Sequence, residues 1–389
     1  MSLSEQDKKF MRCAIDLAKK GQGRTHPNPM VGCVVVEKNK ILGRGYHVYT
    51  DWLHAEVIAI RDAMRRVKTS RKSQQLKNCT LYVTLEPCSS YGRTCPCTDA
   101  IVFSGIKRVV VSAMDPHPGH RGQGLKILKS HGIHVTKDIL AKESMILNKA
   151  YMKALSEKRP YIILKSAVSL DGKIATRSGD SAWITSLASR KLVHKLRAQV
   201  DGVLVGANTV LKDNPLLTAR LSGSTLQPVR IVLDGQGRVL RKSKNLKLFQ
   251  SILNKKNQTE RPYDILVLTQ PGVRTESVVK AWGKKRVKIE SIPILKNKKL
   301  SLKDVLKKLV DLGIYQILVE GGGETNASFL SSGNVDECWF FIAPKLIGGR
   351  SAPTAFEGRG INRIKQAYQL KNVTYRKIGP DILIQGQLS

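Results

Sequence analysis

The chain has 389 residues, enough for two or three domains that each bury their own core. Hydrophobic residues make up 41% of it, a globular level that excludes wholesale disorder, and aromatic residues make up only 5%. The net charge of +36 is spread over both halves of the chain, which favours anionic small substrates over a specific nucleic-acid surface.

The N-terminal segment MSLSEQDKKFMRCAIDLAKKGQG predicts an amphipathic helix that ends near Gly21 or Gly23. It contains no apolar run long enough for a signal peptide, and no later stretch is long and apolar enough to span a bilayer. We therefore expect no membrane partner. The expected location is the cytoplasm, or a compartment reached by a signal already removed.

The first half of the chain alternates predicted strands and helices, a pattern typical of an α/β sandwich. Apolar runs predict strands, and apolar residues at helical spacing predict helices. The segment 32–48 reads as two strands with a turn at Lys38-Asn39-Lys40. Further predicted elements are a helix at 54–67, a strand at 80–86, a helix at 97–105, a strand at 108–114, a helix at 124–132 and a strand at 133–136.

A helical connector over 140–160 leads to a second α/β unit, and we place the domain boundary so that the domains are 1–146 and 147–389. The basic, weakly patterned segment 241–262 is expected to be a solvated loop. The predicted elements of the second domain are strands at 161–175, 202–206, 229–234, 264–269, 316–320 and 337–347, and helices at 189–199 and 302–313.

Three cysteines lie within the short stretch CSSYGRTCPC, at 88, 95 and 97. The chain has 7 cysteines and no secretory signal, so a disulfide framework is the weaker interpretation and a metal site or catalysis the stronger one. His54 and Cys97 each open a predicted helix, and Cys88 follows a predicted strand. One His and two Cys would leave a fourth position of a tetrahedral zinc open for water.

Glu56 lies two residues after His54, close to this metal site without being needed as a ligand. That position suits a proton shuttle, and the combination of His-x-Glu with Glu-Pro-Cys is the pattern of zinc deaminases that attack a base. Cys95 stays open as a fourth ligand, which would make the site a closed structural one.

At this point the sequence resembles the bifunctional riboflavin-biosynthesis deaminase–reductases over nearly its whole length. The motifs THPNPMVGCVVV, HAEVIAI, TLYVTLEPCSSYGRTCPCTDAI and DPHPGHRGQGLKILKSHGI resemble the deaminase domain of that family. The motifs LKSAVSLDGKIAT, WITS, VHKLRAQVDGVLVGANTVLKDNPLLTAR and LVEGGGETNASF resemble its reductase domain. Two unrelated domains thus match in tandem and in order.

The resemblance implies a cytidine-deaminase-like α/β/α sandwich followed by a dihydrofolate-reductase-like α/β domain. It implies a zinc hydrolase that removes the exocyclic amine of the pyrimidine 2,5-diamino-6-(5-phosphoribosylamino)pyrimidin-4-one. It also implies an oxidoreductase that uses NADPH to reduce the ribosyl group of the product to a ribityl chain. The cofactors are then one Zn²⁺ per chain and NADPH, and the partners are small phosphorylated pyrimidines.

In the deaminase motifs, the resemblance assigns the zinc ligands to His54, Cys88 and Cys97 and the catalytic role to Glu56. Asn28 matches a base-binding position. Cys95 stands where the family usually has Pro, Ser90 where His is common, and His117 where Asn is common. These departures concern the surroundings of the base and leave the metal ligands unchanged.

In the reductase motifs, the resemblance assigns residues to NADPH and to the substrate. The positions assigned to NADPH are Ala167, Trp183, Thr209, Asp213, Gly321, Gly322, Gly323, Glu324 and Thr325. Glycines there let backbone N–H groups approach a phosphate. The positions assigned to the substrate are Lys165, Ser181, Arg197, Leu217, Arg220 and Glu320. Arginine suits a phosphate because its fork donates two hydrogen bonds. Asn214 departs from a frequent Asp.

The alternative from another functional class is a nucleic-acid base deaminase with a basic auxiliary domain. The net charge favours it, whereas the reductase motifs and the scarcity of aromatic stacking platforms weigh against it. A chain with one inactive domain has no support, because both sets of motif residues are present. The sequence leaves the oligomeric state open, including a homo-oligomer.

Overall fold

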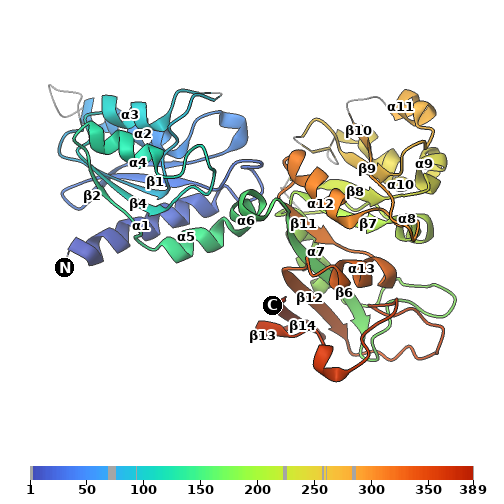
Figure 1. Cartoon of the computed structure of the whole chain (residues 1–389). Helices are drawn as coiled ribbons and strands as arrows, with labels where there is room; N and C mark the ends of the chain where they lie inside the picture. The colour runs from blue at the N-terminus through green and yellow to red at the C-terminus, as the bar shows by residue number, and fades with distance from the viewer. Residues whose placement is uncertain are drawn as a thin grey trace. The chain divides into compact units, whose positions relative to one another are not determined.

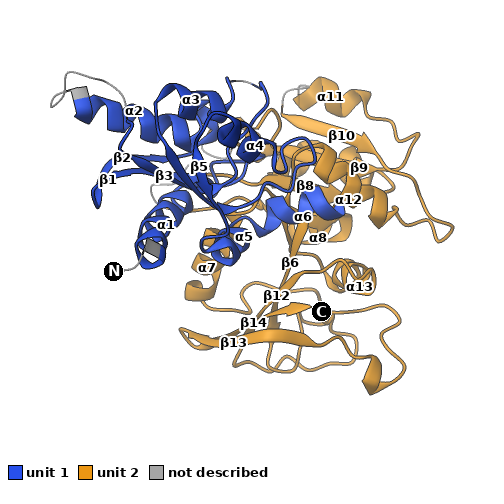
Figure 2. Cartoon of the chain, turned by 60° about the vertical axis from the view of Figure 1, so that its left-hand side comes forward, with its two compact units in different colours: residues 1–158 blue, residues 159–389 orange. Residues whose placement is uncertain are grey.

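A computed structural model describes residues 3–68, 76–92, 94–221, 226–255, 258–259, 261–282 and 286–388. The chain divides into two compact units, Met1–Lys158 and Arg159–Ser389, which Figure 2 shows in different colours. Within the described residues, no helix combines the length and the apolar character needed to cross a membrane.

The first unit is built on a five-stranded sheet in the order β2-β1-β3-β4-β5. β1 pairs antiparallel with β2 and β3, whereas β4 and β5 continue the sheet in parallel. The strands are β1 (Gly32–Glu37), β2 (Lys40–Tyr46), β3 (Thr80–Leu85), β4 (Arg108–Ala113) and β5 (His134–Thr136). The helices are α1 (Leu3–Lys19), α2 (Ala55–Lys68), α3 (Cys97–Phe103), α4 (Gln123–Ser130), α5 (Ala141–Leu147) and α6 (Lys149–Glu157).

Helices cover both faces of this sheet, so its central strands β1, β3 and β4 are buried on both sides. Val34 and Val36 of β1 pack in one cluster with Phe10 and Ala14 of α1. Cys33 and Val35 belong to the opposite cluster, which includes residues of α2, α3 and α4. Figure 1 shows α1 and α5 on one side of the sheet and α2, α3 and α4 on the other. The predicted α/β/α sandwich is confirmed.

The second unit is built on a nine-stranded sheet in the order β10-β9-β8-β7-β11-β6-β12-β14-β13. The strands from β10 to β12 run parallel, and β14 and β13 add an antiparallel edge. The strands are β6 (Tyr161–Ser169), β7 (Gly202–Gly206), β8 (Val229–Leu233), β9 (Ile265–Thr269), β10 (Val287–Ser291), β11 (Gln316–Val319), β12 (Glu337–Ala343), β13 (Leu370–Ile378) and β14 (Asp381–Leu388). The helices are α7 (Leu187–Arg197), α8 (Ala207–Asp213), α9 (Arg238–Arg241), α10 (Lys247–Gln250), α11 (Glu276–Trp282), α12 (Leu302–Asp311) and α13 (Gly323–Ser331).

The segment 241–262 is not a solvated loop, and the prediction for it was wrong. Leu248 and Phe249 in the short helix α10 are fully buried, and Ile252 is nearly so. The buried guanidinium of Arg230 donates a hydrogen bond to Ser251 Oγ at 2.8 Å, which ties the segment to β8. Its apolar residues are confined to 246–253, a stretch too short to stand out among the surrounding lysines and arginines. Residues 256, 257 and 260 lie outside the described part of the chain.

The two units divide at Lys158–Arg159, later in the chain than the boundary at 146/147 expected from the sequence. The reason lies in the hydrogen bonds of the connector. Asn148 binds the backbone of Met30 through both amide atoms, at 2.8 and 2.9 Å. Tyr151 in α6 donates to Asp115 at 3.2 Å. Side chains therefore attach α6 to the first unit.

Helix α2 approaches strand β2 so closely that only glycine fits between them. A Cβ on Gly43 would lie 2.0 Å from the carbonyl oxygen of Ala59, and one on Gly45 would lie 2.1 Å from that of Ala55. Because His54 and Glu56 flank Ala55, this contact fixes where both side chains stand relative to the sheet.

We predict that Gly45→Ala destabilises the first unit by about 1–3 kcal/mol, because the added methyl group must push α2 away from β2. The displacement should also lower the zinc content of the purified protein. Chemical unfolding and metal analysis measure the two effects. Arg44→Ala, at the exposed neighbouring position of β2, is the control. Equal stability and zinc content in all three proteins would contradict this role of Gly45.

Candidate functional sites

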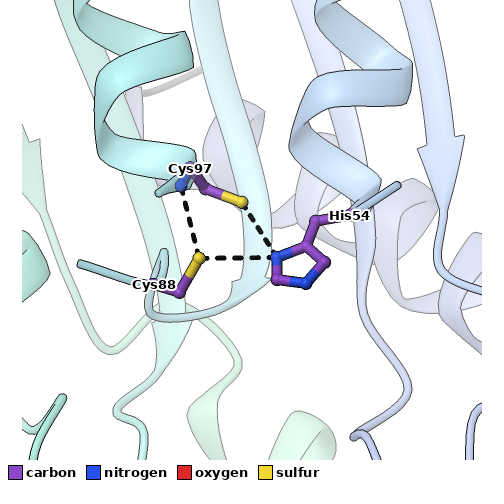
Figure 3. A group of neighbouring side chains, drawn as sticks. All are labelled: His54, Cys88 and Cys97. Carbon is purple, nitrogen blue, oxygen red and sulfur yellow. Dashed lines mark hydrogen bonds between the residues drawn. The ribbon is translucent and has the colours of Figure 1, made fainter. Parts of the chain in front are cut away.

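Three ligand atoms meet where two helices begin and a strand has just ended. His54 directly precedes α2, Cys97 is the first residue of α3, and Cys88 follows β3 (Figure 3). His54 Nδ1 lies 3.1 Å from Cys97 Sγ and 3.4 Å from Cys88 Sγ. The backbone N–H of Cys97 donates to Cys88 Sγ at 3.2 Å. The predicted candidate ligands are thus side by side.

The donor set and its spacing fit zinc. One imidazole nitrogen and two thiol sulfurs lie within 4.8 Å of one another. Tetrahedral zinc would hold such nitrogen and sulfur atoms about 3.6 Å apart. No further His, Cys, Asp or Glu joins this group in the described residues. Cys95 is exposed and is not a member of the group. The arrangement matches an open site with three protein ligands.

Of the three ligands, only Cys88 already has the charge that a metal requires, because the pKa values of His54 and of the Cys97 thiol are raised. Hydrogen bonding from the Cys97 thiol is the main reason why the pKa of Cys88 falls to about 4. The hydrogen bond with Cys88 raises the pKa of His54 to about 8. A thiolate at Cys88 is therefore favoured at neutral pH, and metal binding would release the remaining protons.

Glu56 lies in the first turn of α2 and is only 4% exposed. Burial, followed by the nearby Cys88, raises the pKa of its carboxyl to about 7. A carboxyl that titrates near neutral pH both accepts and donates protons in water at physiological pH. Its position beside the ligand group and outside it fits the proposed proton shuttle.

His47 is a neighbour of this site that the sequence analysis did not single out. Its Nδ1 lies 3.0 Å from the carbonyl oxygen of Leu53, which can only accept a hydrogen bond, so Nδ1 carries the proton. Its Nε2 is then an acceptor and binds the amide nitrogen of Asn28 at 3.0 Å. This chain of bonds orients the Asn28 amide with Oδ1 as its remaining acceptor. The sequence feature that could have indicated His47 is a histidine directly after β2.

Glu86 is a second residue that the sequence analysis missed. It is 4% exposed, and its carboxylate accepts backbone N–H groups from Gly122 at 3.0 Å and Gly124 at 3.1 Å. A Cβ on Gly124 would lie 2.2 Å from the carbonyl oxygen of Pro87. The loop that carries His117 is therefore held against the strand end that leads to Cys88. The sequence feature that could have indicated Glu86 is an acidic residue directly after a buried strand.

The second unit contains a cavity of about 890 Å³. Several residues that the resemblance assigns to NADPH line it, namely Thr209, Asp213, Gly322, Gly323, Glu324 and Thr325, together with Ser181. Gly321 directly precedes this lining, whereas Ala167 and Trp183 are outside it. The cavity lies at the carboxyl ends of parallel strands, where α/β sheets bind nucleotides.

The glycine-rich turn before α13 fits a dinucleotide. A Cβ on Gly321 would lie 2.5 Å from Thr325 Cβ, and one on Gly323 would lie 2.6 Å from the carbonyl oxygen of Thr354. At Gly322 the space opens instead toward the cavity, with Thr209 Oγ1 at 3.8 Å. A phosphate group can therefore approach the backbone N–H groups at the start of this helix.

Glu320, Lys165 and Arg197 form a largely buried cluster beside this turn. Arg197 donates Nε and Nη2 to the Glu320 carboxylate at 2.7 and 3.1 Å, and Lys165 Nζ lies 3.4 Å from Glu320 Oε2. Burial alone would raise the pKa of Glu320, but the charges of Arg197 and Lys165 lower it to about 2. Arg197 Nη1 donates to Thr218 O at 3.1 Å. The fork expected to bind phosphate is thus already paired within the protein.

The remaining expected substrate residues lie around this cluster. Arg220 Nε donates to His194 Nε2 at 3.2 Å, and Leu217 is buried with a left-handed backbone at φ 56°. Trp183 is 63% exposed, and the guanidinium carbon of Arg190 lies 4.3 Å from the centre of its ring. Arg190 and His194 were not singled out in the sequence.

Two families match the chain, one in each unit. The family described as the cytidine and deoxycytidylate deaminase zinc-binding region matches residues 4–113, and the RibD C-terminal domain matches residues 160–384. Curated proteins named riboflavin biosynthesis protein RibD are similar over nearly their whole length. The one from Aquifex aeolicus is 41% identical over 98% of both chains, and the one from Escherichia coli is 38% identical over 97% of this chain and 98% of its own.

Solved structures agree with this similarity. Acinetobacter baumannii RibD matches with a TM-score of 0.84 at 34% identity and covers 100% of both chains. A deaminase/reductase from Thermotoga maritima, described as acting on a diaminohydroxyphosphoribosylaminopyrimidine and a 5-amino-6-(5-phosphoribosylamino)uracil, matches with a TM-score of 0.81 at 34% identity over 100% of both chains.

We predict that Cys88→Ser and Cys97→Ser each lose zinc, whereas Cys95→Ser keeps one zinc per chain, because only the first two thiols face His54 Nδ1. Metal analysis of the purified variants measures this. Loss of metal should also destabilise the first unit, since bound zinc stabilises only the folded state. An empty site in Cys95→Ser combined with a filled site in Cys97→Ser would refute the ligand assignment.

We predict that Glu320 stabilises the second unit at neutral pH and that this contribution is lost in acid. Its folded pKa of about 2 lies below the ordinary value of 4.5, so its stabilising contribution is complete above 4.5 and disappears as the pH falls toward 2. The difference in unfolding free energy between wild type and Glu320→Gln should be about 3 kcal/mol at neutral pH and should shrink in acid. Urea unfolding at several pH values measures it. Glu324→Gln, an exposed residue paired with Lys299, should change stability little. A pH-independent difference for Glu320→Gln would count against the cluster's role.

Proposed function

This chain belongs to the RibD family of riboflavin biosynthesis proteins, and we propose that its two units perform the family's two reactions with the side chains described above. The protein is a bifunctional enzyme that uses zinc and NADPH. The first unit removes the exocyclic amine of a diaminopyrimidine phosphate, and the second reduces the ribosyl group of the product. The observation that carries the assignment of residues is the meeting of His54, Cys88 and Cys97 beside a buried glutamate.

In the deaminase reaction, His54, Cys88 and Cys97 would hold the metal. Zinc, when bound, supplies Lewis acidity at a fourth position that the protein leaves open. Glu56 takes a proton from the attacking water, whose oxygen forms a bond to the ring carbon, and returns a proton to the amine nitrogen. The carbon–nitrogen bond then breaks and ammonia leaves. Its pKa near 7 supports both transfers at neutral pH. Asn28, oriented by His47, accepts a hydrogen bond from the pyrimidine through Oδ1.

In the reductase reaction, NADPH supplies a hydride when bound. The backbone at Gly322 and Gly323 binds its pyrophosphate, a role supported by the open space above Gly322. Lys165 donates a hydrogen bond to the sugar oxygen that gains a proton. Glu320 acts through Lys165 and Arg197 by holding both cations in place. Because the fork of Arg197 is paired, we assign the substrate phosphate to Arg220.

The alternative of a nucleic-acid base deaminase with a basic auxiliary domain has weaker support, because residues 160–384 match a reductase domain. The direct test is an assay of the purified protein with the diaminopyrimidine phosphate, which measures ammonia release and NADPH oxidation and includes a metal analysis of the same sample. The cytoplasmic location and a homo-oligomeric state stay predictions, the first resting on the metabolic role of the family.

We predict that Glu56→Gln keeps its zinc but loses deamination by roughly a hundredfold or more, because the proton shuttle is gone while the three ligands remain. Reduction of the already deaminated substrate by the same variant should be unchanged, which controls for folding. Metal analysis and the two assays measure these effects separately. Deamination near the wild-type rate would show that another group moves the proton.

A further inference from the structure

Arg238 is a cation at the wall of the cavity, and none of the carboxylates that the structure describes forms an ion pair with it. It is the first residue of α9, and its Nη2 donates to Asn208 Oδ1 at 2.8 Å. In contrast, Arg159 and Arg261 of the same unit donate to the carboxylates of Asp336 and Asp201. Among the residues that the structure describes, Arg238 has no ion-pair partner. Asn208 orients its guanidinium without cancelling the charge.

Asp234 is the acidic residue nearest to Arg238 in the sequence, and its carboxylate accepts hydrogen bonds from the backbone. It is fully buried, and its Oδ1 accepts the backbone N–H of Arg238 at 2.8 Å. Its Oδ2 accepts the N–H groups of Val239 at 2.8 Å and Leu240 at 3.2 Å. Both carboxylate oxygens of Asp234 therefore accept backbone N–H groups at the start of α9. The guanidinium of Arg238 can then donate hydrogen bonds to another anion.

A second cation borders the same cavity from the segment between Ile294 and Leu300, which an antiparallel bridge closes into a hairpin. Lys298 lines the cavity with φ 60° and has no ion pair in the described part of the chain. Its neighbour Lys299 instead binds Glu324 at 3.2 Å. A Cβ on Gly235 would lie 3.5 Å from Leu300 Cγ, so this hairpin lies against the turn that leads to Arg238.

The start of α8 links Arg238 to the glycine-rich turn. Asn208 holds the guanidinium of Arg238, and the next residue, Thr209, faces Gly322. A dinucleotide whose pyrophosphate lies at Gly322 therefore has its ribose within reach of the wall formed by α8 and α9. The group that distinguishes NADPH from NADH is a phosphate on that ribose, which requires a cation.

We propose that Arg238, assisted by Lys298, binds the ribose 2′-phosphate of NADPH and thereby makes the reductase prefer NADPH to NADH. The proposal rests on the proposed function, because it needs the cofactor's pyrophosphate at the glycine-rich turn. A guanidinium donates two parallel hydrogen bonds to a phosphate, and the pair is stronger in a partly enclosed cavity than in water. Arg238 is a specificity residue under this proposal and takes no part in hydride transfer.

The test compares two ligands that differ only in this phosphate, adenosine 2′,5′-bisphosphate and adenosine 5′-monophosphate, by calorimetry on the full chain. Wild type should bind the bisphosphate more tightly. Arg238→Gln should weaken the bisphosphate by roughly tenfold to a hundredfold and leave the monophosphate unchanged. Lys298→Gln should cause a smaller loss of the same kind. In the steady state, the KM for NADPH should rise while kcat and the use of NADH stay the same.

The chain offers matched controls. Arg241 belongs to the same helix as Arg238 but is exposed and donates to Gln236 O, and Lys296 belongs to the same segment as Lys298; neither lines the cavity. Arg241→Gln and Lys296→Gln remove the same charges and should leave binding of both ligands unchanged. If Arg238→Gln does not fold, Lys298→Gln against Lys296→Gln decides the question.

The outcomes separate the proposal from the function on which it rests. Equal binding of the two ligands by wild type, or an unchanged preference in Arg238→Gln, would overturn the proposal while NADPH oxidation continues. An equal loss in Arg238→Gln and Arg241→Gln would also overturn it, because net charge alone would then explain the effect. Failure of wild type to bind either ligand or to oxidise NADPH would instead refute the proposed reductase site.

Discussion

Backbone N–H groups at the starts of helices are the donors around which both units arrange their anionic side chains. Such groups have no partner inside their own helix and must be satisfied by other acceptors. In the first unit, the N–H of Cys97 donates to Cys88 Sγ, which helps to hold a thiolate beside His54. In the second unit, Asp234 accepts three N–H groups at the start of α9. The helix after Gly322 opens instead onto the cavity. The carboxyl ends of the strands thus determine where the chemistry lies.

The grouping of His54, Cys88 and Cys97 could be predicted from the sequence because each candidate ligand stands at an element boundary with a local signal. His54 precedes an apolar helical pattern, Cys88 follows a buried strand, and Cys97 follows a proline that starts a helix. The α/β/α sandwich could also be predicted from local sequence, because strands that are buried on both faces give continuous apolar runs. What brings the ligands together, the glycine contact between β2 and α2, depends on backbone proximity that no local pattern records.

Features that the sequence did not predict depend on tertiary burial or on partners far apart in the chain. The apolar residues of 241–262 are buried by the rest of the unit, although their own sequence is basic. β13 is largely exposed, so it lacks the alternation that marks a half-buried strand. Arg197 looks like a phosphate ligand in a motif, but its fork is paired with Glu320, which lies more than a hundred positions later. A motif gives the residue type and leaves its bonding partner undetermined.

The distribution of carboxylates explains how a chain with 66 basic and 30 acidic residues folds and still presents positive charge to ligands. Asp201 and Asp264 are buried and Glu320 is largely buried, and each is paired with one or more cations whose side chains are themselves mostly buried. These pairs are part of the interior, where a missing partner would leave an unpaired buried charge. Because these carboxylates are already paired with other cations, Arg238 and Lys298 at the cavity wall have no acidic partner among the described residues. The same imbalance that gives the chain its high net charge therefore leaves positive side chains facing the cavity that we propose for NADPH, without requiring a nucleic-acid surface.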